Sequence, residues 1–297
     1  MTGAEHYVAP PLWEWWILAY FFFGGLAGGS YAIGTLIRLV GAPSDQRIAR
    51  LAFIVSFLAL LPCPIFLIAD LGQPLRFINM LWDASDGGPS FKAWSPMSVG
   101  SWALLLFGIF SFVSFLGAVA ESGTRALDPF ARLLRGTAGA VWNVIGTGFG
   151  FFLAGYTGVL LAVSNQPVWS DAGWVLGGLF LASALTGSAA LLLALGQWRR
   201  SVDAGTAIRL AAADRNFAIL EAILLVLFLV SVAIAGTIGR VLGIWLLLWI
   251  VVLLGLASPL VFSRLDVARR WPPLAGPVMA LLGVLALRAL VIFGPQI

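Results

Sequence analysis

Long apolar runs separated by short polar connections form the main pattern of this chain. Eight runs are long enough to cross the hydrocarbon core of a bilayer, which takes about 20 apolar residues in a helix. They span roughly residues 15–38, 50–69, 98–120, 138–163, 174–196, 216–236, 241–262 and 274–293. The runs lack period-two alternation and exceed the ~10 residues of a barrel strand. The pattern therefore predicts an all-α integral membrane protein with eight transmembrane helices, arranged as two four-helix bundles in one domain over residues 1–297.

The composition supports this prediction. Of the 297 residues, 61% are hydrophobic and 10% are charged, whereas a soluble domain has about 25% charged residues. The eight runs leave little chain for a soluble domain. The net charge of +4 does not indicate nucleic-acid binding, because it reflects where basic residues lie relative to the membrane.

Basic residues gather in alternate connections between the runs. Outside the apolar runs, the other connections contain only three basic residues, which are Arg76, Lys92 and Arg240. Because basic residues mark the cytoplasmic side, both termini and the connection 70–98 are expected outside, which in a bacterium is the periplasmic side of the inner membrane. The first twelve residues contain Glu5 but no Lys or Arg, so we expect no cleavable signal. Thirteen of the seventeen basic residues share the cytoplasmic side: Arg38, Arg47, Arg50, Arg125, Arg132, Arg135, Arg199, Arg200, Arg209, Arg215, Arg264, Arg269 and Arg270.

Cysteine and histidine limit the cofactors that the chain can hold. A single cysteine, Cys63, cannot bind an iron–sulfur cluster, which needs several thiolates. A single histidine, His6, cannot supply paired axial ligands to transmembrane haems. If the chain handles electrons, it does so without a metal of its own. Cys63 lies between Pro62 and Pro64 and is interpreted as a small buried residue beside a kink.

The connection from Asp70 to Ser98 is the longest polar one. Gly72 and Pro74 end the second helix after Asp70, and Arg76 follows closely enough to pair with this carboxylate. Two interpretations of Asp70 remain open at this point. It is either a solvated acid at the membrane boundary or a proton-transfer group that faces a pocket.

The fourth run carries a stripe of small and polar residues. These recur at spacings of four and three, which places them on one face of a helix. A close helix–helix seam explains the stripe. The alternative is a water-lined path for protons, in which Asn143 and Thr147 hold the waters. The members of the stripe are Asn143, Thr147, Gly150, Ala154 and Thr157.

Two charged residues lie inside apolar runs, and such residues are functional candidates by default. Glu221 is expected about a turn and a half from the cytoplasmic face, where it either transfers protons or reaches toward an arginine. Arg288 lies near the outer end of the last run and needs an acidic or carbonyl partner, for which Asp70 is a candidate.

Tyr20, Asp70, Tyr156 and Arg288 are all expected toward the outer leaflet. A quinone needs an apolar slot for its tail, donors for two carbonyl groups and a group that exchanges protons. Tyrosine and arginine can donate hydrogen bonds, and aspartate can accept a proton. The four residues therefore predict a quinone site, with Tyr20, Tyr156 and Arg288 binding the quinone and Asp70 transferring protons.

Several segments carry a family resemblance. DLGQPLRF and SPMSVGSW are the most specific, and WEWWILAYFFFGGLAGGSY, YTGVLLAVSNQPVW and LRALVIFG extend the similarity along the chain. The sequence resembles the polysulfide reductase membrane-subunit family, also called NrfD-like. The resemblance implies a haem-free membrane anchor with a periplasmic site for menaquinone or ubiquinone. It also implies a ferredoxin-like iron–sulfur subunit as partner, which serves a molybdopterin or other catalytic subunit.

The resemblance also implies roles for single residues. Tyr156 matches a tyrosine of the quinone site, and Asp70 matches an acidic position beside it. Tyr20 stands where a family member has histidine, and a phenol titrates near pH 10 rather than near neutrality. Ile17 stands where that relative has asparagine, so one quinone contact is missing or moved.

The same resemblance makes the connection 70–98 a docking surface for the iron–sulfur partner. Trp82, Phe91 and Trp94 are candidate anchors, and Arg76 is expected to support Asp70. An aromatic belt at the membrane interface explains the three aromatic residues equally well. Two other functions remain open: a proton-translocating or transporter module, and a passive anchor with a degenerate quinone site.

Overall fold

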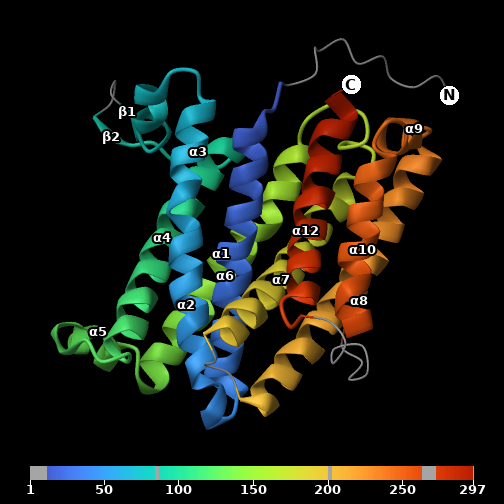
Figure 1. Cartoon of the computed structure of the whole chain (residues 1–297). Coiled ribbons are helices and arrows are strands. Elements are labelled where there is room, and N and C mark those ends of the chain that lie inside the picture. Colours follow the sequence, from blue (N-terminus) through green and yellow to red (C-terminus); the bar gives the residue numbers. More distant parts are fainter. Residues whose placement is uncertain (1–11, 84–86, 200–202, 263–271, 297) are drawn as a thin grey trace.

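The computed structural model describes residues 12–83, 87–199, 203–262 and 272–296, and these form an all-helical bundle with one small hairpin (Figure 1). Most helices run from one end of the molecule to the other. Short 3₁₀ segments and the hairpin lie at the ends. The elements are α1 (Trp15–Val40), η1 (Pro43–Asp45), α2 (Gln46–Leu60), α3 (Pro62–Asp70), η2 (Pro74–Met80), β1 (Trp82–Asp83), β2 (Gly88–Pro89), α4 (Pro96–Ala120), η3 (Arg125–Leu127), α5 (Asp128–Leu133), α6 (Gly136–Ala162), α7 (Gly173–Trp198), α8 (Ala204–Ile234), α9 (Ile238–Leu242), α10 (Leu246–Phe262), α12 (Ala275–Phe293) and η4 (Gly294–Gln296).

Seven helical segments of the described chain are long and apolar enough to cross a membrane. One of them spans Pro43 to Asp70 and includes η1, α2 and α3. A further apolar helix, α10, has 17 residues and is shorter. The expectation of a multi-pass helical membrane protein is confirmed.

Three of the predicted transmembrane segments differ from the helices of the structure. The second predicted segment is divided at Leu61, just before Pro62 and Pro64, because proline cannot continue the hydrogen-bond ladder of a helix. The sixth begins at Ala204 rather than near residue 216, since its first turns are too polar for the apolar pattern to include. The seventh is divided between α9 and α10, with Gly243 at the end of α9.

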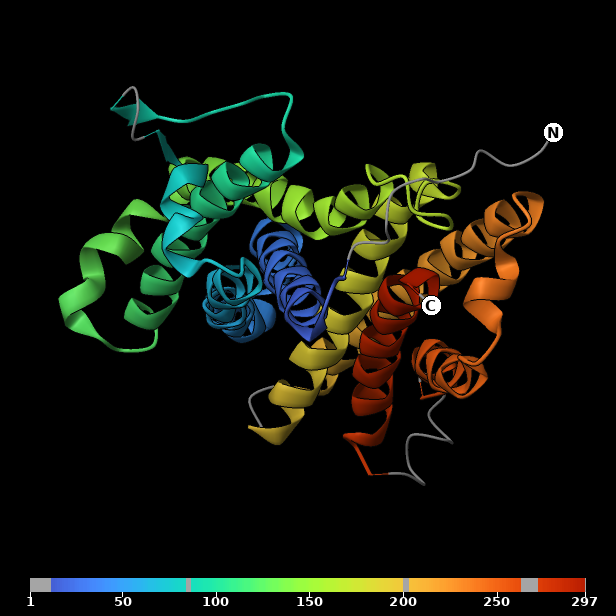
Figure 2. The same cartoon turned by 90° about the horizontal axis from the view of Figure 1, so that it is seen from above.

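Helix α1 lies at the centre of the molecule, where it contacts α2, α3, α6 and α7 (Figure 2). We call α1, α2 with α3, α4 and α6 the first helix group, and α7, α8, α10 and α12 the second. Helix α7 also contacts α1 and α6 of the first group, so the arrangement as two separate four-helix bundles remains a prediction. The central position explains why 83% of the apolar window of α1 is buried, against 28% for α8 at the edge.

Glycines allow the closest approaches between helices. A Cβ added to Gly28 of α1 would lie 2.2 Å from the carbonyl oxygen of Gly150 on α6. Gly255 of α10 and Gly283 of α12 meet in the same way, with an added Cβ 2.4–2.6 Å from the facing Cα. Small residues at these points let the helix backbones pack directly against each other. The Gly150 part of the α6 stripe is therefore a helix–helix seam.

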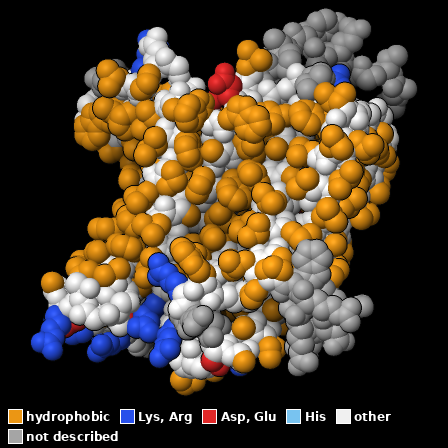
Figure 3. Space-filling view, in the orientation of Figure 1, with side chains coloured by type: hydrophobic (Ala, Val, Ile, Leu, Met, Phe, Trp, Pro, Cys, Tyr) orange, Lys and Arg blue, Asp and Glu red, His pale blue; other side chains and the backbone are white. Residues whose placement is uncertain are grey.

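The two ends of the described chain lie together. The backbone N–H of Trp13 donates to the side-chain oxygen of Gln296 at 2.9 Å, and the Gln296 amide donates back to the Trp13 carbonyl at 3.3 Å. Apolar side chains cover the middle of the surface, and basic side chains gather at the end opposite the chain ends (Figure 3). We call this second end the arginine-rich face. Arg38 and Arg50 contact Glu121 here, and Arg125 of η3 and Arg132 of α5 lie in the segment that follows.

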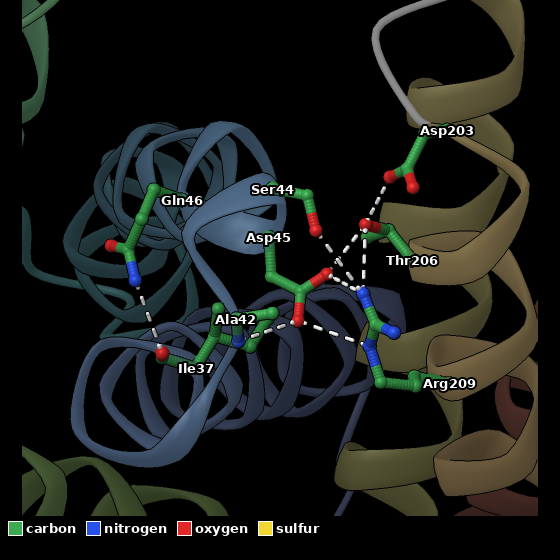
Figure 4. Close-up of polar contacts among 8 residues, drawn as sticks. All are labelled: Ile37, Ala42, Ser44, Asp45, Gln46, Asp203, Thr206 and Arg209. Atoms are coloured by element: carbon green, nitrogen blue, oxygen red, sulfur yellow. Dashed lines mark hydrogen bonds and ion pairs between the residues drawn. The ribbon is translucent and has the colours of Figure 1, made fainter.

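A polar network joins the two helix groups at the arginine-rich face (Figure 4). Arg209 of α8 donates to both carboxylate oxygens of Asp45 in η1, with its Nε at 3.1 Å from Oδ2. The Thr206 hydroxyl lies between Asp45 and Asp203, and the Asp203 side chain is exposed. The hydrogen bond with Thr206 is the main reason why the pKa of Asp203 is lowered below its ordinary value.

Candidate functional site

Two tyrosines and a cysteine come together inside the first helix group. Tyr20 of α1 is 2% exposed, and both Cys63 of α3 and Tyr156 of α6 lie close enough to interact with it electrostatically. A Cβ added to Gly24 would touch the Tyr20 ring at 3.7 Å and the Cys63 sulfur at 3.9 Å, which places these side chains on one wall. No described residue forms a hydrogen bond with the Tyr20 hydroxyl. The hydroxyl of this nearly buried side chain is therefore free to bind a ligand.

Tyr156 closes this cluster toward α4. Its hydroxyl donates a hydrogen bond to the Pro96 carbonyl in the first turn of α4. Its ring stacks on Phe152 with centroids 5.5 Å apart, and it lies so close to Gly100 that an added Cβ would be 2.6 Å from the ring. Gly100 is thus required for the tyrosine to pack against α4.

An apolar groove of about 460 Å³ runs along the helices that border the tyrosine cluster. Pro64 and Leu67 of α3 form one wall, and Leu104 and Gly108 of α4 form the other. The segment η2 covers one end with Phe77 and Met80. Its lining is almost entirely apolar, which suits the tail of a lipid-soluble molecule.

Asp70 and Arg76 do not pair. Asp70 is the last residue of α3 and is half-buried, while Arg76 in η2 is exposed. No ion pair joins the two, although both are described. The charged residue that interacts with Asp70 is Glu14, directly before α1. The expected ion pair between Asp70 and Arg76 is therefore absent from the described chain, and support of Asp70 by Arg76 remains a prediction.

Arg288 of α12 is 1% exposed and is bound by backbone carbonyls rather than by Asp70. Its guanidinium donates to the carbonyls of Phe21 and Phe180 at 3.3 and 3.2 Å and to the Ser183 hydroxyl at 2.7 Å. The expected pairing of Arg288 with Asp70 is wrong, because Arg288 points to α1 and α7. Its acidic neighbour is Glu221 of α8.

Glu221 lies deeper than the sequence predicts. Since α8 begins at Ala204, Glu221 is 17 residues into the helix, or about 25 Å along its axis. It is 4% exposed and lines a small internal space with Thr186 of α7. Glu221 does interact with an arginine, the buried Arg288 of α12, and a role of Glu221 in proton transfer remains a prediction.

Asn143 and Thr147 lie in the half of α6 nearer the arginine-rich face. The Asn143 carbonyl accepts hydrogen bonds from Thr147 at 2.8 Å and from Thr35 of α1 at 3.4 Å. Its side-chain oxygen is buried without a partner in the described chain. The Gly28–Gly150 contact lies between these residues and the tyrosine cluster along α1 and α6. A role of Asn143 and Thr147 in proton transfer remains a prediction.

The three aromatic residues expected at the docking surface are exposed around the hairpin of β1 and β2. Trp94 is 82% exposed, and Trp82 and Phe91 are exposed by about half. The Phe91 ring also contacts Trp102 edge to face, at 6.5 Å between centroids. Partner docking by these side chains remains a prediction.

The family assignment follows from comparison with known proteins. The sequence profile of the family described as "Polysulphide reductase, NrfD" matches residues 5–297. The chain belongs to the NrfD family. It is thus a multi-pass membrane protein of a family of reductase membrane subunits, which in bacteria lies in the inner membrane.

One curated relative supports the assignment to the NrfD family. A selenate reductase subunit of Mesobacillus selenatarsenatis is 28% identical over 127 residues. The matched segment covers 43% of this chain and 26% of the relative, so the chain spans about a quarter of the length of that protein. Its name makes the relative a subunit of a reductase complex.

Within the described parts of this NrfD protein, no three His, Cys, Asp or Glu side chains come together as metal ligands. The structure also shows three buried residues whose positions we did not expect from the sequence. Cys63 lines the tyrosine cluster, Ser183 binds Arg288, and Asp214 is a second buried acid on α8. The position of Asp214 could have been predicted from its seven-residue spacing to Glu221, because this spacing places both residues on one helix face.

Proposed function

We propose that this NrfD protein is a haem-free quinone-binding membrane subunit of a multi-subunit respiratory oxidoreductase. The quinone headgroup binds between Tyr20 and Tyr156, and its tail follows the apolar groove beside α3 and α4. The observation that carries this proposal is Tyr20, whose side chain is 2% exposed, whose hydroxyl has no hydrogen-bond partner in the described chain and which lies beside a second tyrosine. A hydroxyl in such a position is satisfied by a ligand acceptor that enters the cluster.

The chemistry of the cluster fits a quinone. Tyr20 can donate to one carbonyl oxygen, and Tyr156 can donate to the other if its hydroxyl turns from the Pro96 carbonyl. Asp70, at the end of α3, exchanges the protons that accompany the electrons, and its half-buried position gives it access to water. Arg288 acts on the cluster from the far side of α1, because it binds the carbonyl of Phe21 next to Tyr20.

The membrane orientation supports a site at the outer leaflet. Trp13 and Gln296 are hydrogen-bonded to each other, so both ends of the described chain lie on the same side of the membrane. This arrangement requires an even number of crossings. With α10 as the eighth crossing, the seven long segments give that even number. A helix of 17 residues is at the short end of the range that can span a bilayer. The arginine-rich face is then cytoplasmic, and the tyrosines and the loop at 70–98 are periplasmic.

The partner in this proposal is a ferredoxin-like iron–sulfur subunit that docks on the loop at 70–98 and passes electrons to or from a molybdopterin or other catalytic subunit. Exposed Trp82, Phe91 and Trp94 fit such an interface, because large aromatic side chains commonly anchor protein contacts. The reductase subunit among the relatives supports an assembly of this kind.

The test compares Tyr20→Phe and Tyr156→Phe with Tyr31→Phe in the intact complex. Tyr31 is a matched control, since it is a buried tyrosine of α1 whose hydroxyl is bonded to Ser114 at 2.8 Å, away from the cluster. Losing one hydrogen bond costs about 0.5–1.5 kcal/mol, or roughly 2–10-fold in quinone affinity. Quinone turnover and binding should fall in the first two variants only. Equal behaviour of all three variants would contradict the site.

A further inference from the structure

A cavity of about 420 Å³ lies at the arginine-rich face, among the helix ends of the second helix group. It is lined by the last turns of α7, the first turns of α8, Phe262 at the end of α10 and Pro277 at the start of α12. Figure 1 shows these four helix ends away from the two ends of the chain. Ala207, which lines the cavity, directly follows Thr206 of the polar network in Figure 4. The cavity is therefore at the boundary between the apolar belt and the arginine-rich face.

Apolar side chains form most of the cavity wall. Leu193 of α7, Ile208 of α8 and Phe262 of α10 contribute the larger ones, and three prolines at or just before the start of α12 add to them. Ile208 is 63% exposed, so the apolar wall continues onto the outer surface of α8. A wall of this kind favours a hydrocarbon chain that enters from the bilayer.

Arg215 of α8 gives this cavity a positive charge. It is exposed, and the other lining residues of α8 precede it by three, four, seven and eight positions, which places all of them on one helix face. No described residue forms an ion pair or a hydrogen bond with Arg215, whereas Arg209 of the same helix is paired with Asp45. The arginine fork is therefore available to an anion, and its geometry matches the oxygens of a phosphate group.

Gln197 adds a polar group on the α7 side of the cavity. It follows Leu193 by one helical turn, and both residues line the cavity. The side-chain oxygen of Gln197 is buried without a hydrogen-bond partner in the described chain. Buried polar atoms are nearly always paired, so a donor on a bound molecule is expected at this point. The cavity thus combines a cation, a buried acceptor and apolar walls.

We propose that this cavity binds an anionic glycerophospholipid of the leaflet next to the arginine-rich face. The lipid phosphate accepts hydrogen bonds from Arg215, a hydroxyl group of a glycerol headgroup donates to the Gln197 oxygen, and one acyl chain follows Leu193 and Ile208. Basic pockets between transmembrane helices commonly bind anionic headgroups. The cavity volume is within the range of about 300–1,000 Å³ of small-molecule sites, so it holds the headgroup region while the remaining chain lies in the bilayer.

Other ligands match the cavity less well. Free phosphate would bind Arg215 but leave the apolar walls in contact with water. A zwitterionic lipid would bring a positive group to a face that is already rich in arginine, and a quinone has no negative charge for Arg215. The lipid site is independent of the proposed quinone site, because Tyr20 is near the start of α1 and the arginine-rich face is at the other end of that helix.

The first test measures lipid binding by the full chain, purified in detergent and stripped of lipid. Dioleoyl phosphatidylglycerol or dioleoyl phosphatidylcholine is added, and thermal unfolding is followed. A ligand that binds only the folded chain raises its unfolding temperature, so the titration gives an apparent affinity. Wild-type protein should bind the phosphatidylglycerol about tenfold more tightly than the phosphatidylcholine.

Three variants assign this preference to the cavity. Arg215→Gln should remove it, because the phosphate loses its charged donor. Gln197→Leu should weaken phosphatidylglycerol binding by about 2–10-fold and leave phosphatidylcholine binding unchanged, because a choline headgroup has no hydroxyl to donate. Arg125→Gln is the control, since Arg125 of η3 is an exposed arginine of the same face that does not line the cavity. It should retain the wild-type preference.

Two results of this titration, and one with inorganic phosphate, would overturn the site. Equal affinity of wild-type protein for both lipids would remove the role of the headgroup. Equal losses in Arg215→Gln and Arg125→Gln would show attraction by general surface charge. Inorganic phosphate that raises the unfolding temperature as much as phosphatidylglycerol would show an anion site without a lipid.

The second test locates the lipid with a phosphatidylglycerol that carries a photoreactive diazirine in one acyl chain. The full chain is illuminated in nanodiscs, and labelled peptides are identified by mass spectrometry. Peptides with Leu193 or Ile208 should be labelled, and unlabelled phosphatidylglycerol should compete with this labelling. Labelling should fall in Arg215→Gln and persist in Arg125→Gln. Label on other peptides alone would contradict the site, and this result with wild-type protein decides the question even if Arg215→Gln does not fold.

Discussion

The contact between Gly28 and Gly150 allows a prediction of defined size. In Gly28→Ala, the new methyl group would lie 2.2 Å from the Gly150 carbonyl oxygen, whereas an ordinary contact is 3.4–4 Å. Relief of this clash requires α1 and α6 to separate by more than 1 Å, because both contact atoms belong to helix backbone. Overpacking of this kind costs about 1–3 kcal/mol of the free energy of unfolding.

A matched control isolates the clash. Gly148 lies on the same helix as Gly150, and an added Cβ there meets nothing within 4 Å. Gly148→Ala therefore gains the helix propensity of alanine, about 1 kcal/mol, without a clash. The difference between the two variants measures the cost of separating α1 from α6.

The assay is reversible unfolding in mixed micelles of a mild detergent and dodecyl sulfate, followed by circular dichroism. Gly28→Ala should be less stable than Gly148→Ala by about 1–3 kcal/mol. It should also bind quinone more weakly, because Tyr20 and Tyr156 lie on the two helices that separate. Equal stability of the two variants would refute the close seam.

Three further predictions follow from other contacts. Arg288→Met should lower the free energy of unfolding by about 3–5 kcal/mol, because it leaves buried Glu221 without its positive neighbour; added Glu221→Gln should recover part of the loss in the same assay. The pKa of Asp203 is lowered by its hydrogen bond with Thr206, so this contact stabilises the fold at pH above the ordinary value of 3.8 and the stabilisation is lost as the pH falls through the lowered pKa. Unfolding measured across this acidic range should therefore show a steeper loss for wild-type protein than for Asp203→Asn. Gly108→Phe should fill the apolar groove and raise KM for long-tailed quinones but not for tailless ones, as steady-state kinetics of the complex would show.

The hydrophobic pattern was sufficient to predict the helices and the kind of protein. Long apolar runs have one stable solution in a bilayer, so their existence and approximate ends follow from the sequence. The early start of α8 was missed because Ala204 to Arg215 includes polar residues that packing against α7 and the Asp45–Arg209 pair stabilise. Local composition does not report such tertiary contacts.

Pairings between charged residues were harder to predict than the helices. Asp70 and Arg288 are both toward one end of the molecule, but the sequence does not fix how each helix is rotated about its axis. The rotation of α12 directs Arg288 to the Phe21 carbonyl, and that of α8 directs Glu221 toward Arg288. For the same reason, the proximity of Tyr20 to Cys63 could not be derived from spacing along the chain.

The most direct test of the quinone site is a structure of the complex in a lipid nanodisc with a bound quinone analogue. We expect headgroup density within hydrogen-bond distance of the Tyr20 hydroxyl, close to Tyr156, with the tail in the groove between α3 and α4. Density for the analogue at another position, with the space between the two tyrosines closed by protein, would contradict it.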